Sequence, residues 1–125
     1  MYSVVSNVEK LNQLPKNCSM LEVLSNEKVF KRLKADIECL NEAYGADRDL
    51  QTDLGGYAVV IWGSQSEVQN EVENVLTYHE LRSDEYEYMD KIILPERDDI
   101  TVTFRLFLCS SDYAVEIVTI EEVSR

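Results

Sequence analysis

The sequence lacks the features that mark secreted, membrane-embedded or disulfide-stabilised proteins. Its three cysteines, Cys18, Cys39 and Cys109, are odd in number, widely spaced and not arranged as CxxC pairs. No stretch approaches the roughly 18 apolar residues of a membrane-spanning helix, and MYSVVSNVEK at the start lacks the basic and apolar parts of a signal peptide. These absences predict a cytoplasmic protein with reduced thiols, in which Cys39 and Cys109 serve as small buried apolar residues.

Basic side chains are also scarce, and most of the shortage lies after residue 50. The chain has 24 acidic and 12 basic residues, a net charge of −12. Residues 1–50 contain eight acids and seven bases, whereas residues 51–125 contain sixteen acids and five bases. Like charge repels phosphate groups, which disfavours direct binding to nucleic acid or to an anionic membrane. The charge either keeps a small protein soluble or attracts a basic partner.

The segment GGYAVVIWGSQSEV, residues 55–68, has the strand–glycine–helix layout of phosphate-binding loops and nucleophile elbows. It lacks the residues on which both depend. No lysine follows Gly63, as a phosphate-binding P-loop requires, and Gln65 and Glu67 occupy the third and fifth positions of the GxSxG elbow. The layout therefore predicts a strand-to-helix joint without a catalytic motif.

Two interpretations of this joint stay open. Ser64 with Glu67, or Ser66 with Gln69, matches a capping box, in which the two side chains satisfy free backbone groups at the start of a helix. Alternatively, Ser64 and Ser66 contribute with His79 to a site for a small ligand or an anion at the helix N-terminus.

His79 is the only histidine, and its place near the end of a helix gives it a structural role at the negative end of the helix dipole. Nothing in the sequence supplies the other ligands of a metal site, because HxH, HxxxH and DxDxDG patterns are missing. The sequence predicts no catalytic residues, no metal and no cofactor.

Apolar residues recurring every three to four positions predict three helices, at residues 7–14, about 26–44 and about 67–77. A capping box at residues 19–22 predicts a further short helical turn. Uncharged or alternating segments predict four strands, at residues 57–62, 86–94, 100–108 and 113–123. The uncharged strand 57–62 suits an interior position or a face covered by another subunit.

This order, α-α-β-α-β-β-β, predicts one α+β domain over residues 1–125. Its expected architecture has two layers, with the helices on one face of a roughly four-stranded, mostly antiparallel sheet. The last three strands form an antiparallel meander.

The acids of the second half concentrate on the predicted third helix and in the segment after it. The residues expected to form a binding face are Glu67, Glu71, Glu73, Glu80, Asp84, Glu85 and Glu87. Tyr86 and Tyr88 lie nearby and either mark an interface or face the core together from one strand. We expect a non-enzymatic interaction module that docks a basic protein partner, as an inhibitor, immunity protein or nucleic-acid mimic does. The alternatives are a small-ligand binder or minor enzyme, and a homodimer.

Overall fold

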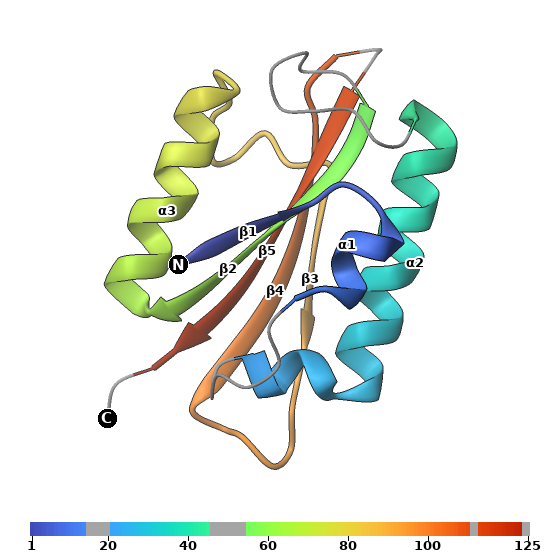
Figure 1. The fold of residues 1–125 in the computed structure, drawn as a ribbon. Coiled ribbons are helices and arrows are strands. Elements are labelled where there is room, and N and C mark those ends of the chain that lie inside the picture. Colours follow the sequence, from blue (N-terminus) through green and yellow to red (C-terminus); the bar gives the residue numbers. More distant parts are fainter. Residues whose placement is uncertain (15–20, 46–54, 111–112, 124–125) are drawn as a thin grey trace.

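The computed structural model describes residues 1–14, 21–45, 55–110 and 113–123 as a five-stranded sheet with helices on both faces (Figure 1). Cys18 and the first two residues of the predicted capping box at residues 19–22 lie outside these residues. The α+β class predicted from the sequence is confirmed.

The sheet is mixed, with four strands predicted from the sequence and one that was not. The strands are β1 (Tyr2–Val5), β2 (Gly55–Ser64), β3 (Tyr88–Ile92), β4 (Ile100–Leu108) and β5 (Tyr113–Glu122). Their spatial order is β1-β2-β5-β4-β3, and only the β2–β5 pair is parallel. The mostly antiparallel sheet and the β3–β4–β5 meander are confirmed, whereas the strand count of four omits β1.

The helices begin where the sequence supplies capping side chains. They are α1 (Val8–Asn12), the short 3₁₀ helix η1 (Leu21–Ser25), α2 (Glu27–Tyr44) and α3 (Gln65–Tyr78). The Asn26 side chain accepts a hydrogen bond from the Lys28 backbone N–H (2.9 Å), which satisfies one free donor at the start of α2. Among the described residues, no helix is long and apolar enough to cross a membrane.

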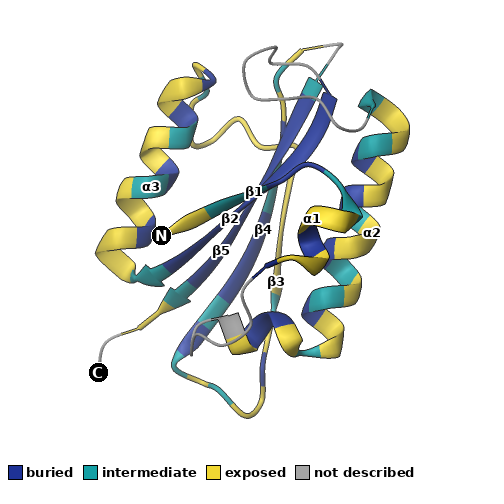
Figure 2. Cartoon of the chain, in the orientation of Figure 1, coloured by how far each residue is buried: buried dark blue, intermediate teal, exposed yellow. Residues whose placement is uncertain are grey.

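The expectation that all helices lie on one face of the sheet is wrong. Alternate residues of β2 belong to two separate cores: Val60 packs in the core that contains α1, η1 and α2, and Ile61 packs in the core beneath α3. Helix α3 therefore covers the opposite face from α2, and the molecule has three layers (Figure 1). Figure 2 shows the consequence, since β2 and β5 are buried along most of their lengths. The interior position expected for the uncharged strand 57–62 is confirmed.

Helix α2 packs closely against the start of β2. A Cβ atom added at Gly56 would lie 2.5 Å from the Leu40 carbonyl oxygen, which is far inside van der Waals contact. The Asn41 side-chain amide, in the next position, donates to the carbonyl oxygens of Ser6 and Gly56, each at 2.9 Å. The C-terminal turn of α2 is thus joined to the ends of two neighbouring strands.

The outer face of α2 carries one unexpected residue. Cys39 is exposed, so its expected role as a buried apolar side chain is wrong, whereas Cys109 is partly buried. The buried stripe of α2 runs through Val29, Leu33, Ile37 and Leu40, and position 39 lies off this stripe.

Candidate functional site

The joint between β2 and α3 is a capped helix start. The Ser64 hydroxyl accepts from the Glu67 backbone N–H at 3.4 Å and donates to the Glu67 carboxylate at 3.0 Å. Gly63 has a φ of 144°, a conformation that favours glycine, and a Cβ there would meet the Glu67 carboxylate at 2.9 Å. Ser66 is exposed in the first turn. Ser64 and Glu67 therefore form the helix cap.

His79 lies at the other end of α3, where it is the C-cap residue. Helix α3 has 14 residues, so at 1.5 Å per residue its ends are about 20 Å apart. A small-ligand site cannot include Ser64 and His79 together.

The His79 ring is buried among tyrosine rings. Its Nε2 lies 2.6 Å from the Tyr57 hydroxyl oxygen, a hydrogen-bond distance. The ring meets that of Tyr78 edge to face, with centroids 5.0 Å apart, and the Tyr113 ring is 5.7 Å away. These contacts fix the end of α3 against β2 and β5. In the described ranges, no three His, Cys, Asp or Glu side chains are arranged to hold a metal ion.

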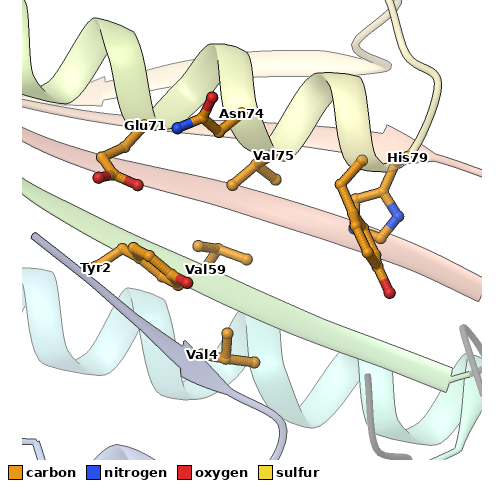
Figure 3. Close-up of a pocket in the computed structure, with 8 residues that line it drawn as sticks. Tyr2, Val4, Val59, Glu71, Asn74, Val75 and His79 are labelled. Carbon is orange, nitrogen blue, oxygen red and sulfur yellow. The ribbon is translucent and has the colours of Figure 1, made fainter. Parts of the chain in front are cut away.

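A groove of about 460 Å³ runs between α3 and the edge strand β1. Figure 3 shows Glu71 opposite Tyr2 at one end and His79 at the other, with Val59 on the floor. The groove is mainly apolar and aromatic, and its one acidic side chain is Glu71. Clefts of about this volume are typical of ligand-binding sites.

The seven acids predicted to form a binding face all lie on α3 or in the connection between α3 and β3. Six of them are exposed, and Glu71 is half-buried at the groove. Arg82 pairs with Asp84 at 3.2 Å and lies 4.0 Å from Glu85. The remaining acids of the group are Glu67, which caps α3, and four that pair with no base among the described residues, Glu71, Glu73, Glu80 and Glu87.

Tyr86 and Tyr88 do not share one face. The Tyr86 ring contacts Phe107 edge to face on the α3 side of the sheet, at 6.4 Å between centroids. Tyr88 instead donates a hydrogen bond to Glu116 at 2.9 Å. The expectation of a shared face fails because β3 begins only at Tyr88, so alternation does not extend back to Tyr86.

Glu116 is a buried acid that the sequence analysis did not single out. It lies in the middle of β5, is 0% exposed, and points to the α2 face of the sheet, as Val118 does two residues later. Burial raises the pKa of Glu116 to about 9, and interaction with the nearby Asp36 carboxylate favours the protonated form further. The signal for it was an acid at an inward-facing position of an otherwise apolar strand.

Arg32 connects this buried acid to the surface. Its Nε donates to Asp36 at 3.0 Å, its Nη1 pairs with Asp90, and its guanidinium lies 5.0 Å from the centre of the Phe104 ring. The hydrogen bond from Arg32 lowers the pKa of Asp90. The pKa of Tyr88 is raised to about 12, mainly by burial and secondly by the charge of the nearby Glu116. This group stabilises the contact between α2 and the β3 edge, and none of its side chains lines the groove beside α3.

Comparison of the chain with known protein families, curated proteins and solved structures found no match. Function therefore has to be argued from the groove and from the acids around α3.

Proposed function

We propose that the protein is a non-enzymatic interaction module that docks a basic protein partner through its acidic surface. The acidic surface comprises Glu67, Glu71, Glu73, Glu80, Asp84, Glu85 and Glu87. The observation that carries the proposal is the composition of residues 65–87, which contain seven acids and a single arginine on one helix and the connection that follows it. An inhibitor, an immunity protein or a nucleic-acid mimic would use such a surface.

The crowded carboxylates do not stabilise the fold, but they favour association with a basic protein. Neighbouring carboxylates repel one another, and their repulsion is relieved when a basic surface approaches. Each exposed pair contributes little in water, about 1 kcal/mol at 4 Å separation, but several together accelerate encounter and fix orientation. The attraction is screened within about 8 Å at physiological salt, so binding must weaken as salt is added.

The experiment compares capture of partners by the wild-type protein and by a variant with a neutralised acidic surface. The variant carries four exposed Glu→Gln changes that avoid the helix cap and the groove, at Glu73, Glu80, Glu85 and Glu87. Basic proteins should be retained by the wild type at about 50 mM salt and released at about 500 mM, where the screening length falls to a few ångströms. The neutralised variant should retain little of them at either concentration.

A control variant has the same net charge as the neutralised variant, but its four changes lie on the opposite side of the molecule. It carries Glu→Gln at four exposed positions of α1 and α2, namely Glu9, Glu27, Glu38 and Glu42. This control should behave as the wild type does. Equal losses in the two variants, or a partner that is indifferent to salt, would refute docking through the acidic surface.

A small-ligand site is the second candidate, supported by the groove of about 460 Å³ beside His79. A ligand that binds the folded state raises the melting temperature by mass action. A thermal-shift screen in which the stabilisation by a compound disappears in His79→Ala would favour this candidate over docking.

We also propose that the protein works in the cytoplasm and that it does not bind nucleic acid directly. Cys39 is an exposed, free thiol, which suits a reducing compartment. Self-association is the remaining expectation, and light scattering tests it in one measurement.

A further inference from the structure

The outer edge of β1 offers backbone groups for pairing. Met1 and Trp62 exchange two hydrogen bonds, from Met1 N to Trp62 O at 3.1 Å and from Trp62 N to Met1 O at 2.9 Å. In an antiparallel pair such bonded positions alternate, so the N–H and C=O groups of Tyr2 and Val4 point away from β2. Among the described strands, none pairs with this outer edge.

This edge differs from the opposite edge of the sheet in its chemistry. Edge strands are usually protected from pairing by charged side chains, proline or bulges. Strand β3 carries Asp90 and Lys91, in keeping with such protection. Strand β1 has the sequence YSVV and carries neither charge nor proline.

The groove lies beside the same edge. The side chains of Tyr2 and Val4 line it, together with Val75 and the exposed Tyr78 from α3. Residues of an added strand that bonded to Tyr2 and Val4 would have their side chains on the same face of the sheet, in the groove. One strand could therefore satisfy the backbone of β1 and cover apolar surface at once.

The negative charge around the groove favours a basic segment as its occupant over a second copy of this chain. Glu71 is the only acidic residue that lines the groove, and Glu67 and Glu73 lie on the same helix. A second copy of this chain, with a net charge of −12, would bring two acidic α3 helices towards one another. A segment with both apolar and basic side chains meets no such repulsion.

We propose that an extended segment of the basic partner, with alternating apolar and basic residues, adds to β1 as a further antiparallel strand and fills the groove with its apolar side chains. This inference rests on the proposed function, because it names how the basic partner is held. Main-chain hydrogen bonds supply affinity and the groove supplies selectivity.

The test uses a short acetylated, amidated peptide of alternating lysine and valine, KVKVKVK, and an analogue with N-methylated valines. The analogue has the same charge and side chains but cannot donate the hydrogen bonds that strand addition needs. Fluorescence anisotropy measures the affinities, and NMR follows hydrogen exchange of the Tyr2 and Val4 amides. We expect KVKVKVK to slow exchange at both amides and the analogue to bind at least about tenfold more weakly, for the loss of two hydrogen bonds.

Variants of the protein supply a second measurement. Val4→Pro removes an outward N–H without removing a bond to β2, and should weaken KVKVKVK binding, whereas Val4→Ala retains that N–H and controls for the smaller side chain. Glu71→Gln should weaken binding about threefold, the effect of one partly exposed charge pair.

The outcomes separate strand addition from docking by charge. Equal binding of both peptides without slowed exchange would overturn strand addition and leave the acidic surface as the docking site. Failure of both peptides at low salt would overturn strand addition, while the neutralised variant would still decide the proposed function. Slow exchange at Tyr2 and Val4 in the free protein, increasing with its concentration, would show that a second copy covers the edge and would overturn the basic occupant.

Discussion

Replacement of Glu116 by glutamine tests the electrostatic account of the core. Glutamine has nearly the same shape and can still accept the hydrogen bond that Tyr88 donates, but it cannot ionise. Burial raises the pKa of Glu116 from 4.5 to about 9. Between these values the folded protein holds a proton on Glu116 that the unfolded chain releases, so stability depends on pH through this one group.

The direction and size of the effect follow from the two pKa values. The stability contributed by protonated Glu116 is complete below pH 4.5 and is lost as the pH rises through about 9. Within that window the loss is about 1.4 kcal/mol for each pH unit. From about pH 5 to about pH 8 the wild-type protein should therefore lose about 4 kcal/mol of unfolding free energy that Glu116→Gln retains.

Urea denaturation followed by circular dichroism at several pH values measures this difference. The pH dependence of acids that do not interact with Glu116 is common to both proteins and cancels when the two curves are subtracted. Glu122→Gln, an exposed acid on the same strand, is the control and should follow the wild type within about 0.5 kcal/mol. Parallel curves for the wild type and Glu116→Gln would show that the carboxyl group has the same charge in the folded and unfolded chains, and would refute the reasoning.

Three further substitutions test individual contacts. Tyr88→Phe removes the hydrogen bond to the buried carboxyl group and should lower the unfolding free energy by about 1–2 kcal/mol in urea titrations; an unchanged midpoint would count against that bond. Gly56→Ala forces a methyl group onto the Leu40 carbonyl and should cost about 3 kcal/mol by the same measurement, so a neutral result would contradict the close packing of α2 on β2. Ser64→Ala should cost about 1 kcal/mol through loss of the helix cap, whereas Ser66→Ala should cost less than about 0.5 kcal/mol; equal melting temperatures for the two would disprove the assignment of the cap.

The sequence predicts the long periodic elements well, because the spacing of their apolar residues shows which face is buried. The stripe of α2 and the alternation of β4 are present as expected. Strand β1 escaped prediction because four residues at a sheet edge, with a mixed burial pattern, carry no clear period. Its pairing depends on β2, more than 50 residues away, and single-sequence periodicity does not report such distant contacts.

The layer arrangement and the candidate site could also be predicted only in part. An amphipathic stripe shows that α3 packs on something, but not on which face of the sheet. The apolar residues on both faces of β2 did contain that information, since a strand buried on both sides needs cover from two directions. The separation of Ser64 from His79 also followed from the length of the helix between them. The groove, in contrast, depends on β1 and could not be predicted without it.

The position of β5 between β2 and β4 has a consequence for synthesis on the ribosome. Among the five described strands, β5 comes last in chain order, and it joins β1–β2 to β3–β4. Until β5 has left the exit tunnel, β2 and β4 lack the strand that pairs with both of them, so their apolar residues are without native cover, a condition that favours chaperone binding. Folding of the central sheet is therefore a late event that completes only after translation has passed residue 122.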